Sequence, residues 1–192
     1  MEKIALMNEK SSEQDLLAEC RNGSRRAFEM FFHQNQKRVF SVALNFFGGD
    51  AQIAEDITQQ VFLKIFTSIE NFRGEAEVTT WLYRVTTNAC IDEQRRKKRF
   101  SFFSDLFGFN EPKSKRTPDE KFESREISGQ VQKALQTIDI KFRLPILLKY
   151  VEGLSYREIA EILDCSEGTI GSRLNRGNKL LARKLAHLKD RF

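Results

Sequence analysis

The chain has 192 residues, enough for one large or two small domains, and a formal net charge of +5 that only weakly favours a nucleic-acid partner. Cys20, Cys90 and Cys165 form no C-x-x-C pair and histidines number only two, so we expect no structural zinc site, disulfide framework or cofactor, and a reduced, cytoplasmic setting. No apolar run is as long as a membrane span, and residues 1–10 do not look like a signal peptide, so we expect no membrane insertion.

Few prolines and glycines interrupt the chain, so the sequence predicts an all-α fold. Ser12 can cap a short helix ending near Gly23, and Ser24 can cap a longer one running to Gly48. Asp50 can cap a third helix. The predicted core faces of the second and third helices are Phe28, Phe31, Phe32, Val39, Phe40, Ala43, Phe47 and Ile53, Ile57, Val61, Ile65, Ile69.

A fourth helix is expected from Thr79 to about Arg99, after a loop over residues 71–78. Trp81 should belong to the core, beside an inward stripe of Leu82, Val85 and Ala89. Another face collects polar and basic side chains: Asn88, Asp92, Arg95, Arg96 and Arg99. Cations at the end of a helix can also simply complement its dipole and stay solvated, and that alternative remains open.

Two further features of the first block are candidate sites. The loop that contains Phe72 and Arg73 could receive a ligand or an unstacked base, or it could be an ordinary helix connection. Asp56, Gln59 and Gln60 share one side of the otherwise apolar third helix, either as a binding surface or as a solvated face.

From residue 100 to about 124 the helical pattern fails, because Gly108, Pro112 and Pro118 fall among charged residues. We therefore predict two small helical domains, residues 1–99 and 125–192, joined by a flexible linker over residues 100–124. Helices should resume through Val131, Leu135 and Ile138. Another should follow with Pro145 in its first turn.

Residues 153–185 predict a helix-turn-helix that inserts its second helix in a DNA major groove. Ala160 should pack where the two helices cross, Asp164 should adopt the positive φ of the turn, and Ser166 should cap the second helix. Ile170, Leu174 and Leu181 should face the core. The opposite face carries Thr169, Ser172, Arg173 and Arg176. The alternative is a solvated helix in an all-α bundle.

An ordered series of segments resembles a known family: D-I-T-Q-Q-V-F (56–62), F-R-G (72–74), T-W-L-Y-R (80–84), a basic helix end, G-L-S-Y-R-E-I-A-E-I-L (153–163) and S-E-G-T-I-G-S-R-L (166–174). The chain looks like a bacterial sigma factor of the small extracytoplasmic-function group. The similarity runs from about residue 13 to residue 188. The resemblance implies region 2 and region 4 domains, core RNA polymerase and promoter DNA as partners, control by an anti-sigma factor, and a monomer within the holoenzyme.

The resemblance also implies site residues. Polymerase would dock on the third helix through Asp56, Gln59, Gln60 and Phe62. The melted −10 element would be held by Phe72, Arg73, Asn88, Arg95, Arg96 and Arg99. The −35 duplex would be read by Thr169, Ser172, Arg173 and Arg176. Asp164 stands where the family usually has Gly, and Gly171 where a basic residue is common; both departures are mild.

Other functions fit less well. A stand-alone helix-turn-helix regulator would leave the T-W-L-Y-R segment and the Arg95–Arg99 run unexplained. An enzyme is not expected, because no nucleophile is paired with a base and His33 and His187 lie in unrelated helices. The phenylalanines that crowd residues 100–109 could pack on the chain's own domains or form a surface for polymerase or an anti-sigma protein.

Overall fold

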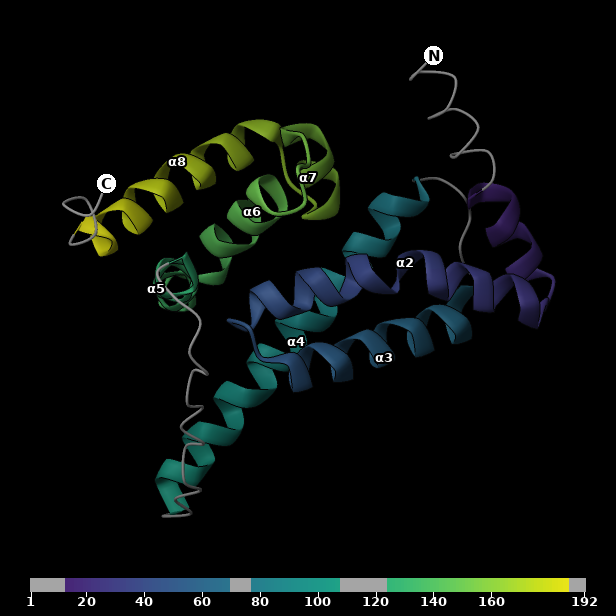
Figure 1. The fold of residues 1–192 in the computed structure, drawn as a ribbon, viewed down its shortest axis with the longest axis horizontal. Helices are drawn as coiled ribbons and strands as arrows, with labels where there is room; N and C mark the ends of the chain where they lie inside the picture. Colours follow the sequence, from purple (N-terminus) through teal and green to yellow (C-terminus); the bar gives the residue numbers. More distant parts are fainter. Residues whose placement is uncertain (1–12, 70–76, 108–123, 187–192) are drawn as a thin grey trace.

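A computed structural model describes residues 13–69, 77–107 and 124–186, and every element within these ranges is a helix (Figure 1). The first element that the structure describes is a short helix over residues 13–21. The longer elements are α2 (Arg25–Phe46), α3 (Ala51–Ser68), α4 (Val78–Phe107), α5 (Ser124–Gln136), α6 (Ile140–Tyr150), α7 (Tyr156–Ile162) and α8 (Glu167–Lys184). The prediction of an all-α fold is confirmed.

Local capping sets the start of the first long helices. The Ser24 hydroxyl accepts a hydrogen bond from the Ala27 amide at 3.2 Å, and the Asp50 carboxylate accepts one from Ile53 at 3.1 Å, as predicted. Between α2 and α3 the chain turns through Gly48 and Gly49, whose φ values of +68° and +87° suit glycine.

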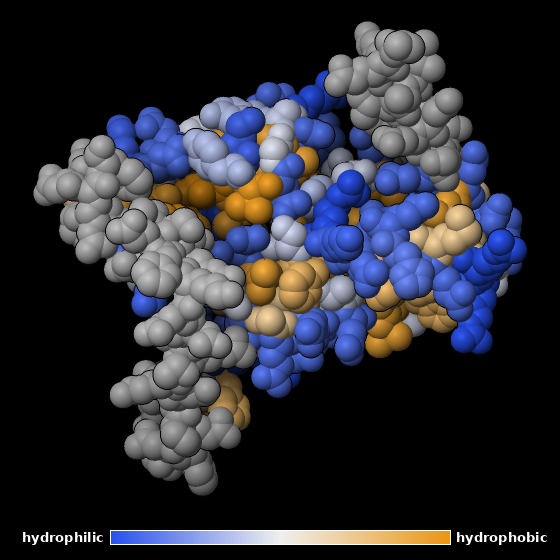
Figure 2. All heavy atoms as spheres, viewed as in Figure 1, coloured by the Kyte–Doolittle hydropathy of each residue, from blue (hydrophilic) through white to orange (hydrophobic). Residues whose placement is uncertain are grey.

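The α2, α3 and α4 helices pack together around an aromatic and aliphatic core, which we call the N-unit (Figure 1). Its fully buried side chains include Phe31, Phe46, Ile57, Ile65 and Leu82. The α5–α8 helices form a second group, the C-unit, around Leu147, Leu148, Ile159, Ile170 and Leu174. Apolar side chains come to the surface in separate patches over both units, surrounded by polar ones (Figure 2).

Two predicted boundaries are wrong. The α4 helix does not end near Arg99 but continues to Phe107, since no proline or glycine stops it before Gly108. Pro145 is not in the first turn of its helix. The α6 helix is capped by Asp139 and starts at Ile140, so Pro145 lies inside it and removes the bond that the Lys141 carbonyl would accept.

The units are in direct contact rather than separate. The α6 helix lies against α2, α7 lies against α4, and buried residues of both units form one continuous cluster. The α8 helix packs most closely on α6 at Gly177, where an added Cβ would lie 2.8 Å from Ile146 Cδ1. The domain bounds 1–99, 100–124 and 125–192 stay a prediction, although residues 100–107 continue α4.

Candidate DNA and polymerase interfaces

One side of α3 presents the polar residues that the sequence singled out. Ile57, Val61 and Ile65 are completely buried on the core side. Asp56 and Gln59 are exposed on the other side, together with Gln60. Because a helix fixes both faces at once, the buried isoleucines hold these three polar side chains toward solvent.

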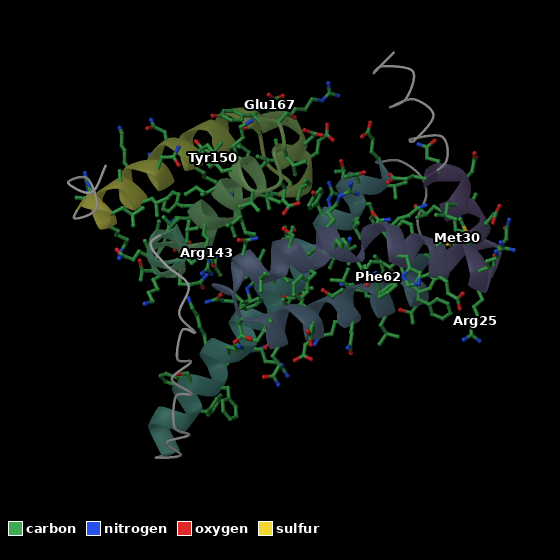
Figure 3. All side chains as sticks on the ribbon, in the orientation of Figure 1. Arg25, Met30, Phe62, Arg143, Tyr150 and Glu167 are labelled. Atoms are coloured by element: carbon green, nitrogen blue, oxygen red, sulfur yellow. The ribbon has the colours of Figure 1, made fainter. Side chains whose placement is uncertain are left out.

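Phe62 does not belong to that surface. Its side chain is only 3% exposed, and its ring lies edge-on to Phe31 and Phe32 of α2, with centroids 6.3 and 4.7 Å away (Figure 3). The prediction that Phe62 contacts polymerase is therefore corrected: it supports α3 from the core, because its position borders the isoleucine stripe and α2 supplies two aromatic partners.

Two apolar residues that sequence reasoning missed extend the α3 surface. Leu63 and Phe66 are 65% and 56% exposed; Leu63 follows Gln59 by about one helical turn, and Phe66 follows Leu63 by about one more. The Phe66 ring rests edge-on against Phe28 at 4.9 Å, which limits its motion. Their exposure could have been predicted from the sequence, because neither residue lies on the helix face of Ile57, Val61 and Ile65 that is buried in the core.

The predicted base-binding residues Phe72 and Arg73 lie outside the described residues. Immediately beyond them, α4 begins at Val78, which is buried, so Val78 belongs to the helix rather than to the loop. Trp81 is half-buried and packs against the core, in agreement with the core role predicted for it.

The basic face of α4 is solvent-facing over its whole length. Asn88, Asp92, Arg95, Arg96 and Arg99 are all exposed. Two of the arginines have acidic partners one turn earlier: Arg95 lies 3.6 Å from Asp92, and Arg96 lies 2.8 Å from Glu93. The hydrogen bond and charge of Glu93 raise the pKa of Arg96, so that arginine is held in place on the helix.

The neighbouring cations differ in how they are engaged. Lys97 sits over the Phe47 ring at 5.5 Å, which draws its side chain toward the C-terminal end of α2. Lys98 and Arg99 instead line a shallow hollow with Asp92 and Arg95. Lys98 was not among the predicted site residues. A hollow with three cations and one carboxylate on its rim can take a phosphate group.

The turn between α7 and α8 has the geometry that the sequence predicted. Ser155 and Glu158 form a capping box at the start of α7, and Ala160 is buried where the helices meet. Asp164 adopts a φ of +49°, and the Ser166 hydroxyl accepts a hydrogen bond from the Thr169 amide at 3.2 Å. These contacts fix the direction in which α8 leaves the turn.

The outer face of α8 brings the four predicted DNA-contacting residues together. Ser172 and Arg176 are exposed, whereas Thr169 and Arg173 are half-buried. The Thr169 hydroxyl is already shared with Ser166 at 2.9 Å, and Arg173 Nη1 lies 3.8 Å from Cys165 Sγ. Ile170 and Leu174 are buried on the opposite side, and Leu181 packs against the core. The face therefore combines constrained side chains with one extended arginine.

The described part of the chain contains no cluster of three or more His, Cys, Asp or Glu side chains able to hold a metal ion. Among the helices of residues 13–69, 77–107 and 124–186, none is both long and apolar enough to cross a membrane.

Each unit matches a known protein family. The Sigma-70 region 2 family matches residues 31–100, and the Sigma-70 region 4 family matches residues 128–181. The RNA polymerase sigma-H factor of Pseudomonas aeruginosa is 29% identical, with coverage of 92% of this chain and 95% of its own length. The extracytoplasmic-function sigma-E factor of Escherichia coli K12 is 28% identical over 95% of this chain and 98% of its own length. The SigE factor of Mycolicibacterium smegmatis is 32% identical over 83% of this chain and 62% of its own.

Solved structures share the fold. CnrH in complex with the cytosolic domain of CnrY superposes with a TM-score of 0.66 at 21% identity, over 91% of this chain and 97% of that one. The sigma factor RpoE of Bartonella quintana, in complex with the anti-sigma factor NepR, also gives 0.66, at 23% identity over 83% of this chain and 96% of that one. Two matched regions in the family's order, and two relatives aligned over 95% and 98% of their own length, establish that the chain belongs to the sigma-70 family, in its extracytoplasmic-function group.

Proposed function

We propose that the protein directs core RNA polymerase to promoters by reading two elements with two different surfaces. The observation that carries this proposal is the presence of two cationic helix faces in two units, one at the end of α4 and one on α8. The α8 face reads the −35 element as duplex, because its helix is capped and backed as a major-groove reader requires. Asn88, Arg95, Arg96 and Arg99 hold the melted −10 strand.

Polymerase docks on the exposed side of α3. Asp56, Gln59 and Gln60 supply the polar contacts, and Leu63 and Phe66 supply apolar area beside them. A surface that combines exposed large apolar side chains with a polar rim has the composition of a protein–protein interface. Phe72 and Arg73 receive the unstacked base that precedes the −10 contacts of α4.

Control by an anti-sigma protein is part of this proposal. Two solved structures of the same fold are complexes, one with the cytosolic domain of CnrY and one with the anti-sigma factor NepR. The protein acts in the cytosol as a monomer within the holoenzyme, and it has no catalytic activity of its own.

Run-off transcription with purified core polymerase tests the proposal. Core plus this protein should produce discrete transcripts from genomic promoters that core alone does not produce. Asp56→Ala with Gln59→Ala should weaken binding to core without loss of helicity, since both side chains are exposed and alanine favours helix. The assignment fails if no specific transcript forms, and operator binding by the protein alone would favour a stand-alone regulator.

A further inference from the structure

The last turns of α4 carry large aromatic side chains that no core covers. Phe100 and Phe102 are 65% and 66% exposed, and every residue from Arg95 to Phe102 is exposed to solvent. This end of α4 extends beyond α2, α3 and α7, the helices that pack against the rest of it (Figure 1). Exposed aromatic side chains that gather at one place on a surface are typical of an interaction site.

A dense positive charge lies directly before these rings. Residues Arg95–Arg99 are five consecutive cations. The carboxylates of Asp92 and Glu93 pair with the first two of them, at 3.6 and 2.8 Å, and so offset only part of this charge. Lys98 and Arg99 line the shallow hollow next to the rings. The aromatic end of α4 is therefore strongly cationic as well as apolar.

The cations and the rings share one side of the helix. At about 100° per residue, Arg95, Arg99 and Phe102 fall within about 60° of one another around the axis, and Phe100 follows about 100° beyond Arg99. Phe102 lies ~10 Å farther along the axis than Arg95, at 1.5 Å per residue. The apolar side chains consequently lie at the tip of α4, and the charges lie just behind them.

This arrangement matches the surface of an anionic lipid bilayer. Helices that bind such a surface place aromatic side chains among the headgroups and cations against the lipid phosphates. Each Lys or Arg near an anionic bilayer raises the affinity about fivefold, because the surface potential is negative. A bilayer is also flat and deformable, so a projecting helix end can reach it without a complementary groove.

Single-stranded nucleic acid and a second copy of the chain fit these rings less well. The Phe102 and Phe103 rings meet edge-on, with centroids 6.2 Å apart and an angle of 78° between their planes. Successive stacked bases are parallel, so two nearly perpendicular neighbouring rings do not extend one stack. A dimer through the rings would bring two runs of five cations close together, and like charges repel.

We propose that the end of α4 binds the surface of anionic phospholipid bilayers, with Phe100 and Phe102 among the headgroups and Arg95 and Arg99 against the phosphates. No part of the helix crosses the bilayer. The lipid contact does not depend on the proposed function, but its consequence does. Because the same arginines are proposed to hold the −10 strand, a bilayer-bound protein cannot open a promoter.

Sedimentation of the full-length protein with lipid vesicles tests the contact. Vesicles of equal parts phosphatidylglycerol and phosphatidylcholine should sediment the protein at low salt, whereas vesicles of phosphatidylcholine alone should not. Added salt should release the protein, because it screens exposed charges. Absence of binding to the anionic vesicles, or equal binding to both kinds, would overturn the proposal.

Phe102→Ala tests the aromatic contribution, with Tyr150→Ala as its matched control. Tyr150 is an aromatic residue of the C-unit that is 63% exposed, close to the 66% of Phe102. Phe102→Ala should weaken binding to the anionic vesicles about tenfold, because less apolar area enters the headgroup layer. Tyr150→Ala should bind like wild type. Circular dichroism should show unchanged helicity for both. An unchanged affinity for Phe102→Ala, or an equal loss for Tyr150→Ala, would contradict the proposal.

Arg99→Gln tests the charge contribution. It should weaken binding to the anionic vesicles about fivefold at low salt, and the difference from wild type should shrink as salt is added. A loss that is the same at every salt concentration would mean that Arg99 does not act through its charge, and the assignment of the arginines to lipid phosphates would be wrong.

The same variants identify the other two occupants. If Phe102→Ala keeps its affinity for vesicles but loses affinity for an unpaired oligonucleotide, the ring is a base-stacking site and the proposal is wrong. If ultracentrifugation shows a wild-type dimer that Phe102→Ala dissociates, and vesicles do not bind, the rings contact a second copy and the proposal is wrong as well.

The consequence for transcription is measured in the run-off assay, with vesicles added before core polymerase. Anionic vesicles should reduce the promoter-specific transcripts made with wild type, and should reduce those made with Phe102→Ala much less. Equal inhibition of the two proteins would overturn the competition between lipid and promoter DNA. If run-off finds no promoter, the proposed function fails while the vesicle result still stands.

Discussion

The two helices proposed to contact DNA are built in opposite ways. Every residue of α4 from Arg95 to Phe103 is exposed, so this part of the helix carries its cations into solvent without a core behind them. The α8 helix has Ile170, Leu174 and Gly177 buried along one side, and Gly177 lets it approach α6 closely. The end of α4 is therefore a helix exposed to solvent, whereas the DNA-contacting face of α8 belongs to a helix whose other side is buried.

This difference matches two kinds of DNA contact. Reading a base edge needs a donor held within a fraction of an ångström, which a packed helix with half-buried side chains such as Arg173 provides. Holding phosphates of an unpaired strand needs positive charge more than fixed geometry. We therefore expect substitutions on α8 to change specificity and substitutions on the α4 end to change affinity evenly.

The largest effect on stability is expected from truncating a side chain on the buried face of α8. Leu174→Ala should cost ~2–5 kcal/mol of unfolding free energy through the cavity that it leaves. Phe100→Ala, at an exposed position on the α4 end, should change stability by less than ~0.5 kcal/mol. Thermal and urea unfolding followed by circular dichroism measure both. If the two variants lose comparable unfolding free energy, the α4 end is packed like α8, and the proposed difference between the two helices is wrong.

The next effect concerns specificity. Arg176→Ala should lose ~1–3 kcal/mol of discrimination at a single −35 position if the exposed guanidinium pairs with a guanine edge. Competition binding with duplexes that vary one base at a time measures this, and Arg183→Ala in the last turn of α8 is the control. A uniform loss across all duplexes would mean that Arg176 contacts backbone.

A smaller effect separates the cations of α4. Arg99→Ala should lower the salt dependence of open-complex formation by about one unit of slope at every promoter, as loss of a phosphate contact does. Arg96→Ala should change it less, because Arg96 is already bonded to Glu93. A template with a pre-melted −10 element should partly rescue both variants. If melting is unaffected by neutralising Arg95, Arg96 and Arg99 together, the basic helix end is only a solvated face.

The local features of the fold were predictable because their chemistry spans three or four residues. The caps at Ser24, Asp50 and Ser166 and the turn at Asp164 each depend on one side chain and its nearest amides. Pro145 was misplaced because Asp139 was not recognised as a cap. The end of α4 was misplaced because the break indicated by Gly108, Pro112 and Pro118 was extended back to residue 100, although no residue before Gly108 breaks the helix.

The features that depend on distant residues were not predictable from periodicity. Phe62 borders the isoleucine stripe, and only the presence of Phe31 and Phe32 on α2 turns it inward. Glu152 meets Ser41 and Tyr83, which are 111 and 69 positions away. Phe100 and Phe102 are 65% and 66% exposed, so the interpretation that they pack on the chain's own domains is wrong for these two.

The smallest effect tests how the turn directs the rigid helix. Asp164 has a φ of +49°, a conformation that costs an ordinary L-residue ~1–2 kcal/mol and glycine almost nothing. Glycine loses ~0.5–1 kcal/mol more chain entropy on folding, so Asp164→Gly should stabilise the C-unit by less than ~1 kcal/mol. Asp164→Ala, which keeps the Cβ without the polar group that tolerates this conformation, should be less stable than wild type. Urea unfolding of the three proteins gives the order. If Asp164→Ala has the same unfolding free energy as wild type, the left-handed conformation of the turn does not require Asp or Gly at position 164. The direction of α8 is then set by its packing on α6 alone.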